Sequence, residues 1–218
     1  SLRLPDRAQR FSYNSSSQSI VAAGHFPGAV VWNATEPDGA TLKFRSGLPV
    51  KSSAISGDGS LIACGNSNGE ILIASGDGRT IEQFEIEDQG AVNSIAFARD
   101  SEFLAAGFQK GQIRVWRGDR PGDEIFRYDL GQPVARIQFS PSNDRLIALP
   151  GGAGRLAVIS LGAEPAGLAA ESPNSARLQS LMIHPDGDKF LTACSDRRAR
   201  AFSTATGEPL PPEYRHDD

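Results

Sequence analysis

Histidines and cysteines are the side chains of this chain that are best suited to bind a metal or to act as nucleophiles. The chain contains His25, His184 and His216, and its cysteines are Cys64 and Cys194. None of these residues stands at the short spacing of a zinc ligand pair from another. Two cysteines also cannot form a disulfide framework. The sequence therefore predicts no metal site, and we expect two buried free thiols, which favours a reducing, cytoplasmic location.

Other motifs of catalysis and cofactor binding are missing or incomplete. The sequence has no Gly-x-Ser-x-Gly nucleophile elbow. The glycine-rich stretch 151–154 could approach a phosphate, but neither a helical segment nor a lysine follows it. The Asp-Gly pairs at Asp58, Asp77 and Asp186 suit tight turns and lack the ligand spacing of a calcium loop. We therefore expect no enzyme activity and no cofactor.

Charge and hydropathy argue against two further kinds of partner. The 218 residues include 22 Lys and Arg and 26 Asp and Glu, which gives a formal net charge of −4 at pH 7. A mildly acidic chain without a basic block is poorly suited to bind nucleic acid or an anionic membrane. No apolar run approaches the roughly 20 residues that a membrane-spanning helix needs. We therefore expect neither nucleic acid nor a membrane as a partner.

The elements that must position any functional residue belong to an internal repeat. Apolar residues that end a first alternating segment recur at intervals of 42 to 44 residues, at Tyr13, Ile55, Phe97, Phe139 and Ile183. Two further sets of positions, which begin at Ile20 and Trp32, repeat at intervals of 41 to 44 residues. Agreement among three sets of positions over five units is the signature of a repeat architecture.

Each unit consists of short segments with the period of a β-strand. In the third unit these segments are 91–97, 102–107, 112–116 and 124–130. Three of them alternate apolar and polar residues, and turns rich in Gly, Pro, Asp and Asn separate them. Because no helical periodicity competes with this pattern, we expect four strands per unit and an all-β protein.

These units resemble the repeats of the WD-repeat β-propeller family. The similarity lies in the run 111–116 (GQIRVW), the run 202–207 (FSTATG) and the turns of Ser-Pro-Asp-Gly type. It implies a β-propeller of four-stranded antiparallel blades, at approximately 8–45, 49–86, 91–130, 133–171 and 177–213. The repeats are degenerate, since Lys110 replaces the family's Asp and Phe202 its Trp, and the stretch 207–212 (GEPLPP) resembles bacterial-looking arrays of this type.

The resemblance also implies a ring larger than five blades. Family members usually close with about seven blades. The chain starts without Met and ends two residues after His216, which stands where a further blade would open. We therefore expect five blades of a larger ring that another segment or chain completes. A closed ring of five blades is the alternative.

Propellers of this family mostly bind partners at the rim formed by the second turn of each blade and the start of its first strand. We therefore predict a partner-binding rim that contains His25, Phe26, Phe108, Gln109, Lys110, Arg197, Asn93 and Arg136. Lys51 and Gln179 accompany these residues on the first strands. Phe26 and Phe108 are the main candidates, because exposed aromatic rings often anchor an interface. The alternative is that both rings pack beneath neighbouring blades.

The densest basic segment is 197–200 (RRAR). Its Arg198 and Arg200 should share one strand face, on which they are either solvated or in contact with an acidic peptide. For the whole chain we expect a non-catalytic scaffold or sensor that binds a protein or peptide. The alternatives are a propeller that binds a small molecule or acts as an enzyme through its central channel, and a purely structural array.

Overall fold

The computed structural model describes residues 8–14, 17–24, 27–33, 42–76, 79–118, 120–161, 167–174 and 177–215. All regular elements in these ranges are β-strands. The same ranges contain no helix that is long and apolar enough to cross a membrane.

The strands follow one another in antiparallel groups of four, each of which is a blade. The first two blades contain β1 (Ala8–Asn14), β2 (Ser19–Gly24), β3 (Pro27–Asn33), β4 (Leu42–Ile55), β5 (Leu61–Asn66), β6 (Glu70–Ser75) and β7 (Thr80–Glu85). The third contains β8 (Val92–Phe97), β9 (Phe103–Phe108), β10 (Gln112–Arg117) and β11 (Arg120–Asp129). The fourth and fifth contain β12 (Val134–Phe139), β13 (Arg145–Pro150), β14 (Gly154–Ser160), β15 (Gly167–Asn174), β16 (Leu178–Ile183), β17 (Lys189–Cys194), β18 (Arg198–Ser203) and β19 (Pro209–Arg215).

Within each blade, every strand pairs with the next strand in sequence. The last three blades are separate four-stranded sheets, whereas the first two share β4 and form one seven-stranded sheet. The first part of β4 pairs with β3, and the part from Val50 onward pairs with β5. The boundary expected between residues 45 and 49 thus lies inside a continuous strand.

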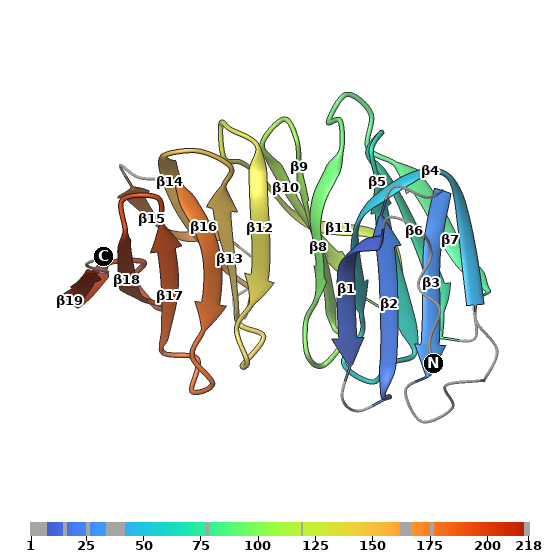
Figure 1. The fold of residues 1–218 in the computed structure, drawn as a ribbon, viewed down its shortest axis with the longest axis horizontal. Coiled ribbons are helices and arrows are strands. Elements are labelled where there is room, and N and C mark those ends of the chain that lie inside the picture. The colour runs from blue at the N-terminus through green and yellow to red at the C-terminus, as the bar shows by residue number, and fades with distance from the viewer. Residues whose placement is uncertain are drawn as a thin grey trace.

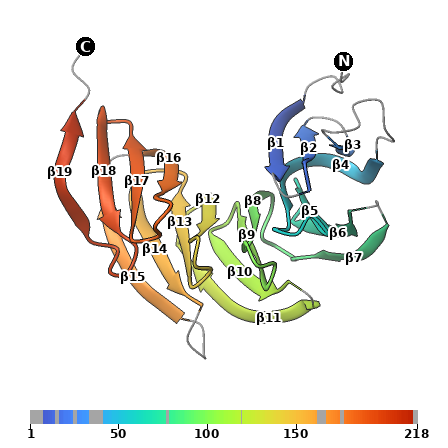
Figure 2. The ribbon, with the colours of Figure 1, turned by 90° about the horizontal axis from the view of Figure 1, so that it is seen from below.

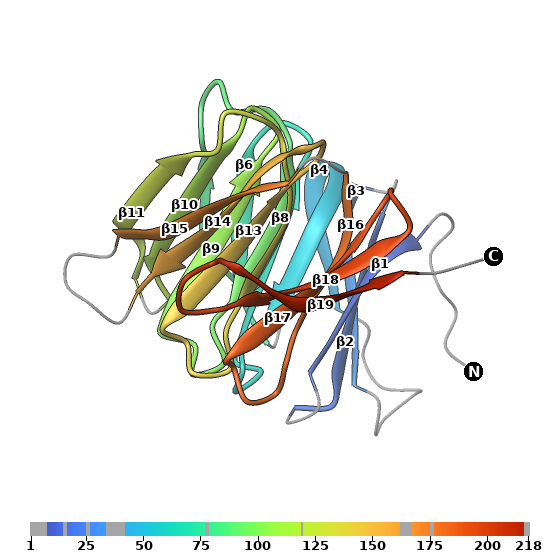
Figure 3. The ribbon, with the colours of Figure 1, turned by 90° about the vertical axis from the view of Figure 1, so that its left-hand side faces the viewer.

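The blades lie side by side in an open arc (Figure 1). Figure 2 shows β1, β8, β12 and β16 on the concave side of this arc and β7, β11 and β15 on its outer side. Figure 3 looks at the arc from the end that the fifth blade forms. The predicted fold class, a β-propeller of four-stranded antiparallel blades, is confirmed. The alternative of a closed five-blade ring is wrong for the described residues, because the first and fifth blades lie at opposite ends of the arc.

The hydrophobic core lies between successive blades. In the third blade, Ile113 and Val115 are fully buried against Leu146 and Ala148 of the fourth. A corresponding cluster joins the fourth and fifth blades and includes Phe190, whose ring stacks on that of Phe202. Middle strands such as β9 are buried along their whole length, as expected for their short apolar runs. This packing fixes the blades to one another and leaves the first strands facing the concave side.

Candidate binding groove

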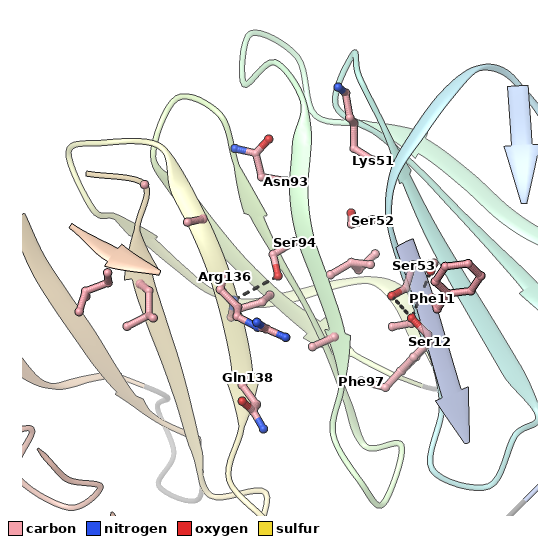
Figure 4. A pocket seen from close by; sticks show the side chains of 18 of the residues that line it. Phe11, Ser12, Lys51, Ser52, Ser53, Asn93, Ser94, Phe97, Arg136 and Gln138 are labelled. Atoms are coloured by element: carbon pink, nitrogen blue, oxygen red, sulfur yellow. Dashed lines mark hydrogen bonds between the residues drawn. The ribbon is translucent and has the colours of Figure 1, made fainter. Parts of the chain in front are cut away.

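The first strands of the five blades line a groove of about 840 Å³ on the concave side of the arc (Figure 4). Its wall comes from β1, β4, β8 and β12 and from the segment that begins β16. Residues that are far apart in the sequence meet here because each repeat contributes the same strand to one surface.

A β-bulge recurs at the same position in every one of these strands. The register shifts between Val50 and Ser52, and again at the equivalent positions of β1, β8, β12 and β16. The apolar residue before the bulge is buried in four of the blades, as Val50, Val92, Val134 and Leu178. The extra residue of a bulge is free to turn away from the sheet. In four blades this residue lines the groove, as Lys51, Asn93, Ala135 and Gln179.

Hydrogen bonds between neighbouring first strands hold the wall of the groove in place. The Ser52 hydroxyl donates to the carbonyl oxygen of Val92 over 2.8 Å, and the Asn93 amide donates to that of Val134 over 3.1 Å. The Ser94 hydroxyl in turn accepts a hydrogen bond from the main-chain N–H of Ile137 at 3.1 Å (Figure 4). Such side-chain bonds to the neighbouring backbone fix the spacing of the blades.

Close approach of the blades also depends on a glycine. A Cβ atom at Gly107 would lie 2.3 Å from a methyl carbon of Val134. No side chain larger than hydrogen fits at this position without a shift of β12. The glycine at the end of this middle strand therefore sets the distance between the third and fourth blades.

The charged side chains that line the groove are all cationic. They are Lys51, Arg136 and Arg177, each of them exposed. Within the described part of the chain, none of the three forms an ion pair or a side-chain hydrogen bond, and no carboxylate lines the groove. Figure 4 shows Lys51 on the β4 side of the groove and Arg136 on the β12 side. The cations are therefore available to a ligand.

Two aromatic rings on β1 add apolar surface to the same groove. The side chains of Phe11 and Tyr13 are 56% and 62% exposed. Tyr13 occupies the repeat position that Phe139 fills as a buried residue in the fourth blade. An exposed aromatic ring at a position that is elsewhere part of the core is a feature of binding surfaces.

The lining offers hydrogen bonding and charge rather than groups that transfer protons near neutral pH. Among the described residues, no His, Cys, Asp or Glu lines the groove, and no cluster of three or more such residues could hold a metal ion. The two cysteines are buried as free thiols, and burial raises the pKa of Cys64 to about 12. Both thiols are therefore structural.

The structure brings part of the predicted rim together. Asn93 and Arg136 line the groove with their predicted companions Lys51 and Gln179. Gln109 and Lys110 are exposed in the turn between β9 and β10, where the side-chain oxygen Oε1 of Gln109 accepts a hydrogen bond from the Asn93 side-chain amide at 3.1 Å. Arg197 is exposed in the turn between β17 and β18, outside the lining. His25 and Phe26 lie outside the described residues.

Phe108 is not a surface residue, and the prediction of an exposed ring at this position is wrong. Strand β9 continues through Phe108, which places its ring on the same strand face as Leu104 and Ala106. The ring is fully buried in the apolar cluster between the second and third blades. The alternative that the sequence left open, packing beneath a neighbouring blade, is the one that the structure adopts.

Arg198 and Arg200 of the basic segment form ion pairs within the fifth blade itself. The Arg200 guanidinium contacts Asp196 at 2.6 Å and Glu213 at 2.9 Å, and Arg198 contacts Glu213 at 2.7 Å. In the third blade Arg114, at the position equivalent to Arg200, pairs with Glu124 at 2.8 Å. These arginines connect the third and fourth strands of a blade and leave no unpaired cation for an acidic peptide.

Sequence reasoning missed Phe11, Tyr13, Gln138 and Arg177 as groove residues. Phe11 and Tyr13 lie in a segment in which apolar and polar residues alternate, where the apolar positions indicated core, and Arg177 precedes β16. The signal that could have found them is the repeat itself. Aligning each first strand on its bulge position places these residues on one surface with Lys51 and Asn93.

A comparison with protein families adds an independent observation. Residues 43–149 match the model of the Vps8 beta-propeller family. The match extends from β4 into β13 and so includes three of the first strands that line the groove. It supports a relationship to β-propeller families. No curated protein matches the chain significantly.

Proposed function

We propose that this chain is a non-catalytic protein-interaction propeller of WD-repeat type that binds a protein or peptide partner in its concave groove. The observation that carries this proposal is the groove itself. It combines exposed aromatic rings with cations that have no partner among the described residues. Surfaces of this composition are enriched at protein interfaces, where aromatic and arginine side chains contribute most of the binding energy.

The similarity of residues 43–149 to a Vps8 propeller supports the same proposal. Propellers present side chains on a rigid scaffold and imply no particular reaction. The degenerate repeats suit a bacterial protein of the WD-repeat type. Two buried free thiols suit a reducing compartment, and we place the chain in the cytoplasm.

An enzymatic role of the groove is less well supported. General acid–base catalysis needs a side chain that exchanges protons near the working pH, most often His or a carboxylate. The described lining contains Lys, Arg, amide and hydroxyl side chains instead. These groups bind and orient a ligand.

We also propose that another segment or chain extends the arc. The outward face of the fifth blade carries Ala199 and Ala201, both partly exposed, where the third blade has the buried Ile113 and Val115. A further blade packed on this face would bury these alanines. Ala193, on the same face and exposed, is a suitable position at which to detect it.

Site-specific photo-crosslinking in the cell of origin tests both interfaces. A photoreactive amino acid replaces Gln138 or Gln179 in the groove, or Ala193 on the open face. We expect discrete covalent adducts from the groove positions, and mass spectrometry identifies the crosslinked polypeptide. The purified polypeptide should then bind the purified chain and suppress crosslinking from the groove.

Gln83 provides the matched control, because it has the same residue type and is exposed on the outer strand β7. Adducts from Gln138 and Gln179 should be absent or much weaker at Gln83. The same set of adducts from all three glutamines, or none from the groove, would contradict a protein-binding groove.

A further inference from the structure

We propose that the groove takes an extended acidic peptide, whose carboxylates contact Lys51, Arg136 and Arg177 and whose apolar side chains pack on Phe11 and Tyr13. This inference rests on the proposed function and adds the chemistry of the partner.

The charge of the groove differs in sign from that of the chain. The formal net charge is −4, yet the described lining holds three cations and no carboxylate. Elsewhere in the described structure Arg114, Arg127, Arg145, Arg198 and Arg200 each lie within 3.1 Å of a carboxylate oxygen. A local excess of positive potential in a concave surface attracts a ligand of opposite charge.

The positions of the three cations favour several separate anionic groups over a single small anion. Lys51 belongs to β4, Arg136 to β12, and Arg177 immediately precedes β16. Three different blades therefore supply them, along the length of the groove. A chain with carboxylates at intervals can contact each cation in turn, and an arginine can hold a carboxylate through two parallel hydrogen bonds.

The limited positive charge of the groove, rather than its aromatic rings, favours a peptide over a nucleic acid. Phe11 and Tyr13 project from the same strand at positions two residues apart, so that both rings lie on one strand face. Apolar side chains of a peptide can cover these rings. Three cations on an otherwise acidic protein provide little of the phosphate neutralisation on which nucleic-acid affinity depends.

The wall of the groove also provides hydrogen-bonding groups for a main chain. Gln138 is half-buried and Gln179 is exposed, and both line the groove. Each amide side chain both donates and accepts hydrogen bonds, as an extended peptide backbone requires. Ser52, Ser94 and Asn93 are already bonded to the neighbouring blade, so that the wall is organised before a ligand binds.

Fluorescence anisotropy with labelled peptide pools of equal length tests this assignment. In one pool every second position is Glu or Asp, with apolar and aromatic residues between. In the second pool Gln and Asn replace the acids, and in the third Lys replaces them. We expect the acidic pool to bind at least about tenfold more tightly than the amide pool. Added salt should weaken this binding, because screening reduces attraction between exposed charges.

Two variants with equal loss of charge locate the interaction. One carries Lys51→Gln, Arg136→Gln and Arg177→Gln in the groove. The control carries Arg99→Gln, Arg120→Gln and Arg215→Gln, which are exposed cations outside the lining. We expect the groove variant to lose at least about tenfold in affinity for the acidic pool, and the control to lose less than about twofold. Replacing both Phe11 and Tyr13 by Ser should weaken binding without changing its dependence on salt.

Several outcomes would overturn the assignment. These are equal binding of the acidic and amide pools, preference for the lysine pool, and equal losses in the two charge variants. A single-stranded oligonucleotide that competes as strongly as the acidic pool would identify the groove as a nucleic-acid site. If the acidic pool fails while photo-crosslinking still captures a partner from Gln138 and Gln179, the acidic assignment falls and the interaction function stands.

Discussion

Several arginines on the third and fourth strands of the blades pair with carboxylates, whereas the cations of the groove have no partner in the described part of the chain. Arg114 and Arg200 connect two strands of their own blade through a glutamate. Arg136 extends from a first strand and contacts no carboxylate. The same residue type therefore stabilises the fold in one region and remains available to a ligand in the other.

Aromatic rings also differ between the two regions, with the exception of Tyr214 on β19, which is exposed. On the outer strands Phe84 contacts Trp116 edge to face, with ring centroids 5.4 Å apart, and Phe126 stacks on Tyr128. In the groove, Phe11 is more than half exposed. Selection for stability alone would bury such a ring, since burial of an aromatic side chain contributes a large part of folding free energy. The contrast is the one that a partner bound at the first strands, as proposed above, would produce.

Replacing a buried phenylalanine outside the groove and an exposed one inside it should give the largest difference in the free energy of unfolding. Phe108→Ser removes a fully buried ring and places a hydroxyl in an apolar cluster, and we expect it to lower the free energy of unfolding by about 3–5 kcal/mol. Phe11→Ser, at an exposed ring, should change it by less than about 0.5 kcal/mol. Urea denaturation of both variants measures the difference. A stable Phe108→Ser variant would show that the space between the second and third blades can close around the lost ring.

Arginine substitutions in the two regions should also differ in their effect on the free energy of unfolding, but by less than the phenylalanine substitutions do. Arg200→Leu removes the cation that contacts Asp196 and leaves Glu213 with Arg198 alone, and we expect a loss of about 1–2 kcal/mol, because the Arg200 side chain is only 12% exposed while its partners are partly hydrated. Arg136→Leu should change the free energy of unfolding by less than about 0.5 kcal/mol. Urea denaturation again provides the measurement.

A double-mutant cycle with Glu213→Gln separates the ion pair from packing by the arginine stem. A coupling free energy near zero would mean that Arg200 contributes through Asp196 or through its alkyl chain rather than through Glu213. A large loss from Arg136→Leu would mean that the groove cation also holds the fold, and the contrast between the regions would fail.

The repeat predicted the blades more closely than it predicted the groove. In the third blade the expected strands 91–97 and 112–116 correspond to β8 and β10 with ends that differ by one residue. The strand expected at 102–107 instead spans Phe103–Phe108. Phe108 is therefore the last residue of this buried strand and not the first residue of the turn, and this small difference decided whether Phe108 was a contact or core. Strand ends depend on turn hydrogen bonds that local sequence patterns specify poorly.

Predicting the groove requires information that no single repeat contains. Its cations occupy different positions in different repeats, so the 42-residue pattern alone does not group Lys51 with Arg136. Bulges move residues of the first strands toward the concave side, and the exposure of Phe11 depends on how the first and second blades meet. Similarly, the ion pair between Arg200 and Glu213 depends on the register of β18 and β19, which the sequence leaves open.

The smallest of the three expected effects is that of acid pH on the stability gap between the wild type and Arg200→Leu. The hydrogen bond from Arg200 lowers the pKa of Asp196 below its ordinary value of 3.8, and bonds from Arg200 and Arg198 lower that of Glu213. A carboxyl whose pKa is lower in the folded state stabilises the fold above its ordinary pKa and loses this effect as the pH falls toward the lowered value. The stability gap between the wild type and Arg200→Leu should therefore narrow below about pH 4.

The narrowing should be modest, because both carboxylates remain partly in water. Asp58, whose pKa the Ser56 hydroxyl and the neighbouring N–H of Ser60 hold at about 2, contributes equally to both proteins and cancels in the comparison. Arg136→Leu provides the second control: no carboxylate lines the described groove, so its small stability difference from the wild type should stay constant between neutral and acid pH.

Thermal unfolding followed by circular dichroism at a series of pH values measures all three proteins. A gap for Arg200→Leu that stays constant through this range would show that the loss comes from packing, and that the arginines of the two regions differ in burial rather than in their charge partners.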